Sequence, residues 1–321
     1  MKACVVQELS GPSGMSYDDV PDVAGGPDNV VIDVRAAGVC FPDLLLTRGE
    51  YQLKLPPPFA PGMEVAGVVR SAPDGSDFAV GQRVSAFTMM GGYAEQVAVA
   101  PENVMPTADG VDDAEAAALL GNYYTMYFAL ERRGALRRGE TVLVLGSAGG
   151  IGTASIQIAK ALGARVIAMV HRPQAMDYVS TLGADVVLPL TDGWAQAVRD
   201  ATDGRGVDLV VDPVGGAAFD DAIRVIATEG RLLVIGFAAG GIPTVKVNRL
   251  LLRNVAVVGV GYGEFVNRTP GAQAQIGAGL AELVAAGLRP PPPIRFPLNE
   301  GAAALQTLGD GGVLGKLVLE P

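Results

Sequence analysis

The chain has 321 residues, which is enough for about two domains of ordinary size. Hydrophobic residues make up 49% and charged residues 18%, a composition that supports packed cores and excludes an intrinsically disordered protein. The net charge of −10 repels nucleic acids and anionic membranes, so neither is expected as a partner. Cys4 and Cys40 are the only cysteines, which excludes a disulfide framework and a cysteine-rich zinc site. No apolar run resembles a signal peptide or reaches the roughly 20 residues of a membrane-spanning helix, so we expect a cytoplasmic protein.

Residues 1–117 are rich in turns and strand-like. The stretch "NVVIDVRAAGV", residues 29–39, alternates apolar and polar side chains as a half-buried strand does. Glycine and proline recur at short spacing in "GGPD", "PPPFAPG", "APDGSD" and "MMGGY". This rhythm predicts antiparallel strands joined by tight turns.

The pattern changes near Ala114. A long helical stretch, "DDAEAAALLGNYYTMYFALERRG", is expected with an interruption near Gly121. After it, strand-like and helix-like segments alternate, which predicts βαβ units and a parallel sheet. The strands are almost continuous Val, Leu and Ile, as expected when helices cover both faces of a sheet. The expected strands are "TVLVLG", "RVIAMV", "DVVLPL", "VDLVVDPVG" and "GRLLVIGFA", and the expected helices lie at 153–163, 174–182, 194–201 and 219–227.

The C-terminal part contains a strand "VAVVGVG", a helix near 273–287, the turn "RPPPPIRF" and a closing strand "GKLVLEP". This part resembles the first segment more than the middle one. We therefore expect a discontinuous domain of residues 1–117 and 256–321, with residues 118–255 inserted as a second domain.

A glycine-rich loop joins the first strand and first helix of the βαβ series. Gly146, Gly149 and Gly152 lie three residues apart, and Ser147 stands where the pattern G-x-G-x-x-G has its first glycine. Such glycines permit a tight turn and a close approach to a diphosphate, and the helix N-terminus offers free N–H groups to it. We expect the segment from Ser147 through Gly149 and Gly150 to Ile151 to bind a dinucleotide, against the alternative of a plain tight turn.

The next strand bears on the choice of dinucleotide. An NAD site usually has Asp or Glu at the end of that strand, where it binds the ribose 2′-hydroxyl. Here the strand ends at Val170 and is followed by His171 and Arg172. A guanidinium suits a 2′-phosphate, so we expect Arg172 to bind NADPH there, unless it is a solvated surface arginine. His171 either stacks near the adenine or is an exposed bystander.

The whole chain resembles the zinc-free quinone oxidoreductase branch of the medium-chain dehydrogenase/reductase superfamily, the zeta-crystallin-like proteins. The resemblance implies an α/β protein with a GroES-like β-rich catalytic domain, a Rossmann doubly wound parallel-sheet domain, a cleft between them, and a homodimer. The stretches that carry it occur in the family's order: "GVCFPDLLLTRGEYQ", "PPPFAPGMEVAGVV", "GGYAEQVAV", "AAALLGNYYTMYFAL", "GSAGGIGTASIQIAKALGA", "VDLVVDPVGG", "GRLLVIGFA", "NRLLLRN" and "GKLVLEP".

The resemblance also indicates that no metal takes part. Relatives with catalytic zinc carry a Cys, His, Cys ligand set, and these positions read Cys40, Met63 and Gly121 here. One sulfur ligand does not hold zinc, which needs about three protein ligands at a catalytic site. Without a Lewis acid, the implied reaction is NADPH-dependent hydride transfer to a quinone or an α,β-unsaturated carbonyl. The alternatives are an enoyl-thioester reductase and a cofactor-binding protein with little turnover.

The resemblance places Cys40, Phe41, Asp43 and Tyr51 on the substrate side of the cleft. Tyr51 is expected to donate a hydrogen bond or a proton to the substrate oxygen. The alternative is that its ring serves only in packing. Many relatives have Asn in place of Cys40. If Cys40 has no catalytic role, it is a small apolar residue buried in the core.

The resemblance also names residues for the cofactor. The cleft for the cofactor opens at Asn122, Tyr123 and Thr125. The nicotinamide and its ribose are approached by Val214 and by the loop of Gly236, Phe237 and Ala238. Lys316 either reaches the cofactor or is a surface lysine. Some relatives bind the 2′-phosphate with a lysine and a tyrosine. Here Ala175 and the pair Pro189–Leu190 stand near those positions, which leaves Arg172 to bind the phosphate.

Overall fold

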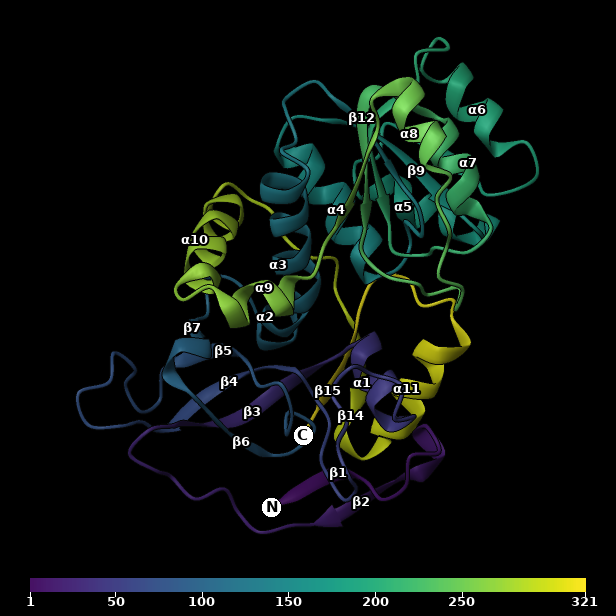
Figure 1. The fold of residues 1–321 in the computed structure, drawn as a ribbon. Helices are drawn as coiled ribbons and strands as arrows, with labels where there is room; N and C mark the ends of the chain where they lie inside the picture. The colour runs from purple at the N-terminus through teal and green to yellow at the C-terminus, as the bar shows by residue number, and fades with distance from the viewer. The chain divides into compact units, whose positions relative to one another are not determined.

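The computed structural model describes residues 1–321 and divides into two compact units (Figure 1). Unit 1 consists of Met1–Gly121 and Arg289–Pro321, and unit 2 is Asn122–Leu288. The second crossing between the units thus lies at residue 288, beyond the expected position at 255. The physical reason is strand β13 (Ala256–Gly259), which pairs with β12 and so extends the sheet of unit 2.

Unit 1 is built mainly from antiparallel strands. Its seven-stranded sheet has the order β14-β15-β3-β4-β5-β7, with β6 also paired to β3, and β1 and β2 form a separate pair. The strand predicted at 29–39 is β3, but it is not half-buried: consecutive residues such as Val30, Val31 and Ile32 are all buried. The strands are β1 (Lys2–Val6), β2 (Met15–Asp19), β3 (Val30–Val39), β4 (Glu64–Ser71), β5 (Arg83–Phe87), β6 (Gln96–Val99), β7 (Val104–Pro106), β14 (Ile294–Pro297) and β15 (Leu317–Glu320).

Three helices complete unit 1. Helix α2 (Asp113–Ala118) begins with a capping box, in which Asp112 Oδ1 accepts the N–H of Glu115 at 2.7 Å and Glu115 accepts the N–H of Asp112 in return. Helices α1 (Phe41–Thr47) and α11 (Gly301–Asp310) were not among the expected elements. The predicted break in the long helical stretch is confirmed, because α2 ends at Ala118 and α3 begins at Gly121.

Unit 2 contains the predicted parallel sheet. Its six strands have the order β10-β9-β8-β11-β12-β13, and every neighbouring pair is parallel. The chain order reverses between β8 and β11, and open α/β sheets bind ligands at the carboxyl ends of strands at such a point. These strands are β8 (Thr141–Val144), β9 (Arg165–Val170), β10 (Val186–Pro189), β11 (Val207–Asp212), β12 (Ile226–Val234) and β13.

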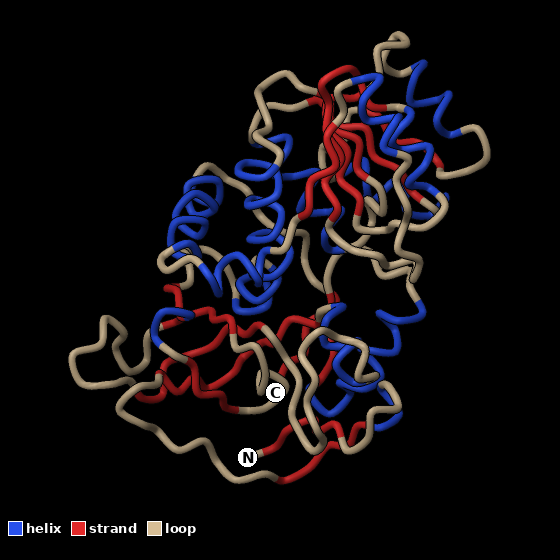
Figure 2. Tube along the Cα trace, viewed as in Figure 1, coloured by secondary structure: helices blue, strands red, loops and turns tan.

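Helices cover both faces of this sheet, with α4 on one side and α7 and α8 on the other (Figure 1), and Figure 2 shows the strands in red between blue helices. The buried Val, Leu and Ile of β8, β9 and β11 explain why their sequences lack polar alternation. The α/β fold class is thereby confirmed. The helices are α3 (Gly121–Tyr127, continuing as a π-helical segment Phe128–Arg133), α4 (Gly150–Ala161), α5 (Met176–Thr181), α6 (Trp194–Asp200), α7 (Ala218–Arg224), α8 (Val247–Arg253), α9 (Tyr262–Arg268) and α10 (Ala272–Ala285).

None of the helices combines the length and the apolar character needed to cross a lipid bilayer.

Candidate functional site

The glycine-rich loop of unit 2 runs from the end of β8 to the start of α4. Ser147 anchors it: the Ser147 hydroxyl donates to the carbonyl of Val144 at 2.8 Å, and the Ser147 N–H donates to the carbonyl of Met169 at 3.2 Å. The Ser147 side chain is fully buried. Its hydroxyl therefore fixes the turn against the sheet instead of facing a ligand, which leaves contact with a ligand to the backbone of the loop.

The glycines of the loop serve different purposes. Gly146 has a φ of +61°, a conformation that favours glycine. A Cβ on Gly152 would overlap the backbone of Gly146 and Ser147, so this glycine permits the helix to pack on the loop. A Cβ on Gly149 would meet nothing closer than the Gly146 oxygen at 3.8 Å. Internal packing does not require a glycine at position 149, so the loop has open space there.

The N-terminus of α4 adjoins this open space. Gly149 is the residue before the helix and provides no side-chain cap. The N–H groups of Gly150, Ile151 and Gly152 have no acceptor within the chain, as is usual in a first helical turn. Unpaired N–H groups and the positive end of the helix dipole form a binding site for an anion. The room and the donors both fit a dinucleotide diphosphate.

Two further loops lie at the same edge of the sheet. The loop after β11 contains Val214, and the loop after β12 contains Gly236, Phe237 and Ala238. They are joined by backbone hydrogen bonds, because Ala238 donates to Pro213 at 3.1 Å and Ala239 donates to Val214 at 3.0 Å. The N–H groups of Gly236 and Phe237 have no acceptor within the chain, and the Phe237 side chain is exposed. The structure thus brings these predicted residues together at the carboxyl edge.

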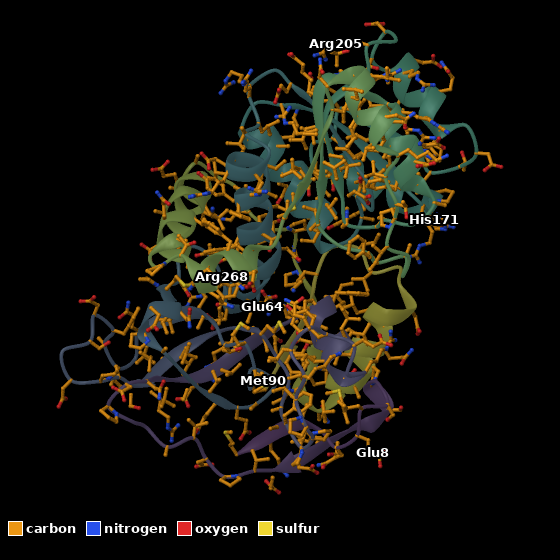
Figure 3. All side chains as sticks on the ribbon, viewed as in Figure 1. Glu8, Glu64, Met90, His171, Arg205 and Arg268 are labelled. Carbon is orange, nitrogen blue, oxygen red and sulfur yellow. The ribbon has the colours of Figure 1, made fainter.

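His171 and Arg172 directly follow β9, the strand next to β8. Both side chains are exposed and neither has a hydrogen bond or an ion pair within the chain; Figure 3 shows His171 at the outside of unit 2. The Arg172 guanidinium is therefore available to an anionic ligand. Ala175 is buried and contributes no charge beside it.

The three residues expected at the start of α3 have different surroundings. The amide group of Asn122 lies directly against Gly150, where any Cβ would collide with it. Thr125 is half-buried. The hydroxyl of Tyr123 donates to Gln157 Oε1 of α4 at 2.5 Å, and its ring is almost fully buried. Asn122 therefore borders the N-terminus of α4, whereas Tyr123 packs the helix pair together.

Unit 1 contains a buried cluster of ionisable groups around Glu64, which Figure 3 labels. Cys40 Sγ donates to Glu64 Oε1 at 3.1 Å, and the Lys316 ammonium forms an ion pair with the same oxygen. Lys316 Nζ also donates to Cys40 Sγ at 3.2 Å, and the N–H of Gly121 donates to Glu64 Oε2. Glu64 is 1% exposed and Lys316 is 8% exposed, so each charge depends on the other for compensation.

This environment keeps Cys40 protonated and Lys316 charged. Burial, followed by the negative charge of Glu64, raises the pKa of the Cys40 thiol well above its ordinary value. Burial works against the ammonium of Lys316, but its contacts with Cys40 and Glu64 outweigh burial and raise its pKa. Lys316 is not the surface lysine that was one of its two expected roles, because it is 8% exposed and its ammonium contacts Glu64 and Cys40.

Asp43 joins three segments of unit 1. Its carboxylate accepts the N–H of Cys40 at 3.0 Å, the N–H of Gly62 at 3.0 Å and the hydroxyl of Tyr93 at 3.1 Å. The Asp43 side chain is 0% exposed. These contacts fix the position of Cys40 and of the approach to β4.

Tyr51 belongs to the same electrostatic environment. Burial, followed by electrostatic interactions with Asp43 and Cys40, raises the pKa of Tyr51, so its phenol stays protonated near neutral pH. Its hydroxyl accepts only a long hydrogen bond of 3.5 Å, from the neighbouring Gln52. The Tyr51 proton is available for donation.

Glu64 and Tyr93 were missed by sequence reasoning. One signal was present for Glu64: a carboxylate inside the apolar stretch "GMEVAGVV" is buried only when it is paired. Tyr93 carries no comparable signal, because an aromatic residue in a strand-rich segment is ordinary core.

Zinc does not fit this cluster. At the positions of the zinc ligands in related enzymes, Met63 offers a thioether, and Gly121 offers only a backbone N–H that is bound to Glu64. No three His, Cys, Asp or Glu side chains of the chain lie close enough together to hold a metal ion. The ammonium of Lys316 is the cation that Cys40 and Glu64 contact.

We expect Asp43→Asn to change how stability depends on pH. Burial raises the pKa of Asp43 to about 7. Between about pH 4 and 7 the folded state therefore holds a proton that the unfolded state has lost, so this group makes stability fall as pH rises. Urea unfolding followed by circular dichroism should show a shallower fall in Asp43→Asn than in the wild type. The exposed Asp19→Asn is the control, and an identical slope in all three proteins would show that Asp43 does not titrate in this range.

Comparison with known proteins supports one family throughout the chain. Residues 26–113 match the alcohol dehydrogenase GroES-like domain, and residues 150–276 match the zinc-binding dehydrogenase family. Quinone oxidoreductase-like protein 2 of Rattus norvegicus is 36% identical over 267 residues, which are 82% of this chain and 76% of that protein.

Solved structures are similar over the full length. A probable oxidoreductase from Mycobacterium abscessus has 60% identity and a TM-score of 0.93, with 100% of this chain and 99% of that chain covered. The quinone oxidoreductase of Thermus thermophilus, solved also in complex with NADPH, has 36% identity and a TM-score of 0.87, with 100% of both chains covered.

Proposed function

Because the chain belongs to the zinc-free quinone oxidoreductase branch of the medium-chain dehydrogenase/reductase superfamily, we propose that it is an NADPH-dependent reductase of quinones or α,β-unsaturated carbonyls. The open space at Gly149, beside the unpaired N–H groups of α4, is the observation that carries the proposal. The NADPH complex of the Thermus relative supports the choice of nucleotide.

In unit 2 we infer the contacts with NADPH from the unpaired hydrogen-bond donors and from the space beside Gly149. The backbone of Gly149, Gly150 and Ile151 binds the diphosphate, and Asn122 and Thr125 border it. Arg172 binds the 2′-phosphate and His171 lies near the adenine. Val214 and the loop Gly236, Phe237 and Ala238 hold the nicotinamide, largely through the backbone.

In unit 1 we assign proton donation to Tyr51, with Cys40 as the second candidate. Bound NADPH would supply the hydride, and a quinone or enone then needs one proton on the oxygen where negative charge develops. Tyr51 keeps its proton near neutral pH and has no strong acceptor, which suits a donor. Asp43, Glu64 and Lys316 fix the surroundings of Cys40 without themselves releasing a proton to the substrate.

The proposed reaction requires no metal. A conjugated acceptor spreads the incoming charge onto its oxygen, so orientation and one hydrogen-bond donor suffice. A simple alcohol would need a group that stabilises its alkoxide, and the cluster in unit 1 offers neither zinc nor histidine. Elemental analysis of the purified protein should find no stoichiometric zinc, and a chelator should leave turnover unchanged. One zinc per chain together with chelator-sensitive turnover would overturn this part of the proposal.

A substrate panel tests the function. NADPH and NADH consumption is measured with quinones, short enals and enoyl thioesters, and NADP reduction is measured with ethanol and benzyl alcohol. We expect turnover with a quinone or an enone, and a lower rate in Tyr51→Phe with unchanged NADPH binding. Preference for the thioesters would identify an enoyl-thioester reductase. Inertness toward every acceptor, despite tight NADPH binding, would indicate a binding protein.

We expect Arg172→Ala to remove most of the preference for NADPH over NADH. A well-formed charge-assisted phosphate contact contributes roughly 1.5–3 kcal/mol, and an exposed one contributes less. The NADPH affinity should therefore fall about tenfold, while NADH binding stays constant. Titration calorimetry with both nucleotides measures the ratio. If the ratio does not change, Arg172 does not contact the phosphate.

A homodimer is part of the proposal. Four aliphatic side chains on α8 and the loop before it, Ile242, Val247, Leu251 and Leu252, are 72–79% exposed. The neighbouring strand β13 is an edge strand, paired on one side only. An apolar surface beside the free edge of a sheet is suited to binding a second copy of the chain. Sedimentation velocity should give a dimer for the wild type and a monomer for Leu251→Asp/Leu252→Asp; a monomeric wild type would refute the dimer.

A further inference from the structure

Asp212 ends strand β11 and is 1% exposed. Its Oδ1 accepts two backbone hydrogen bonds, from the N–H of Val214 at 2.9 Å and from the N–H of Gly215 at 2.8 Å. No lysine or arginine contacts it, and burial raises its pKa. A buried carboxylate whose partners are the backbone of its own following loop determines the shape of that loop.

This loop is joined to the loop after β12. The carbonyls of Pro213 and Val214 accept the N–H groups of Ala238 and Ala239, and the N–H of Gly216 donates to the carbonyl of Gly241 at 3.2 Å. Gly215 and Gly216 have φ angles of +65° and +61°, so the chain turns sharply beyond the carboxylate. A displacement of Val214 would therefore also displace Ala238 and Ala239.

The same loop also packs against the glycine-rich loop. A Cβ on Gly146 would lie 3.0 Å from Val214 Cγ2 and 3.5 Å from Pro213 Cγ. Gly146 therefore has little space toward Val214 and Pro213, and Val214 cannot move toward it without moving the loop. The carboxylate of Asp212 thus contacts the loop after β11, and this loop contacts the two other loops at this edge of the sheet.

We propose that Asp212 is a positioning residue for the cofactor: by holding the N–H groups of Val214 and Gly215, it sets the three loops that bind the dinucleotide. This inference rests on the proposed NADPH function. Asp212 itself does not touch the ligand and acts through the backbone of Val214. For this role the side chain at position 212 needs an oxygen that accepts the N–H groups of Val214 and Gly215, and it does not need a negative charge.

Three variants separate the acceptor from the charge and from general stability. Asp212→Asn keeps an acceptor oxygen without charge, whereas Asp212→Leu has a similar size and no acceptor. Asp208→Leu is the matched control, because Asp208 is a buried acid at the other end of β11 that accepts the N–H of Thr141 at 2.8 Å and pairs with Arg205. NADPH affinity is measured by titration calorimetry and stability by thermal unfolding.

We expect NADPH affinity to fall at least tenfold in Asp212→Leu and less than threefold in Asp212→Asn. Asp208→Leu should lose stability and keep its NADPH affinity within twofold. Hydrogen exchange without ligand should accelerate at Val214 and Gly215 in Asp212→Leu alone. If Asp212→Leu does not fold, Asp212→Ala replaces it in every measurement.

Three outcomes would overturn the inference: wild-type affinity in the variant without an acceptor, an equal loss of affinity in Asp208→Leu, or an equal loss in Asp212→Asn. A wild-type protein that does not bind NADPH would refute the proposed function, and the ligand-free hydrogen exchange then shows separately whether Asp212 shapes the loop. Unchanged exchange at Val214 and Gly215 would refute that local role as well.

Discussion

Replacing Lys316 with methionine is expected to destabilise unit 1 by roughly 3–5 kcal/mol, the usual cost of leaving a buried charge without its partner. The ammonium is the only cation in contact with Glu64, which is 1% exposed. After the substitution, Glu64 keeps only the thiol of Cys40 and the N–H of Gly121 as donors. These two donors do not neutralise a full negative charge.

The double variant Lys316→Met/Glu64→Gln is the control. With both charges removed the desolvation cost disappears, so most of the lost stability should return. Hydrogen exchange of peptides from β4 and β15 is the appropriate measurement, because the single tryptophan, Trp194, lies in unit 2 and does not report on unit 1. If the single variant loses less than about 1 kcal/mol of stability, the buried pair contributes no more than a weak surface ion pair does.

Two glycine substitutions should separate ligand binding from folding. Gly149 has a φ of −81°, which any residue adopts, and its Cβ would meet only the Gly146 oxygen, at an ordinary van der Waals distance of 3.8 Å. We expect Gly149→Ala to change stability by less than about 1 kcal/mol. NADPH affinity should nevertheless fall on the order of tenfold or more, because the methyl group occupies the space in which a diphosphate approaches the helix N-terminus.

Gly152→Ala is the contrasting variant. Its Cβ would overlap the backbone of Gly146 and Ser147, which cannot give way as a flexible side chain does. Stability should fall by roughly 1–3 kcal/mol, and NADPH affinity should fall with it because the loop is displaced. Titration calorimetry measures the NADPH affinity of both variants, and thermal unfolding measures their stability. Wild-type affinity in Gly149→Ala would mean that no diphosphate lies at this loop.

The fold could be read from the sequence wherever hydrophobic periodicity and turn residues agree. The apolar strands of unit 2 and the strand at 29–39 are of this kind. Helix α8 was missed because it does not bury its apolar residues: Leu251 and Leu252 are 77% and 79% exposed, so the pattern of a core-facing helix is absent. The boundary at Leu288 was missed because β13 is short and its pairing with β12 is a tertiary contact.

The candidate site was predictable where chemistry is local in sequence. The glycine-rich loop, His171 and Arg172 are recognisable by their place after a strand. The contacts among Cys40, Glu64, Gly121 and Lys316 join residues that lie 24 to 276 positions apart in the sequence. Only the folded sheet brings them together. Asp212 resembles any acid at a strand end, and the two backbone hydrogen bonds that its carboxylate accepts distinguish it only in the structure.

Transfer of a labelled hydride tests the central claim most directly. The protein is incubated with a small enone and with NADPH deuterated at C4 of the nicotinamide, using each of the two C4-deuterated isomers in turn, and the product is examined by mass spectrometry and NMR. We expect one isomer to deliver a single deuterium to the β-carbon of the reduced enone, with no metal added. Absence of deuterium from the product with both isomers, or oxidation of simple alcohols by a protein inert toward every quinone and enone, would contradict the proposed function.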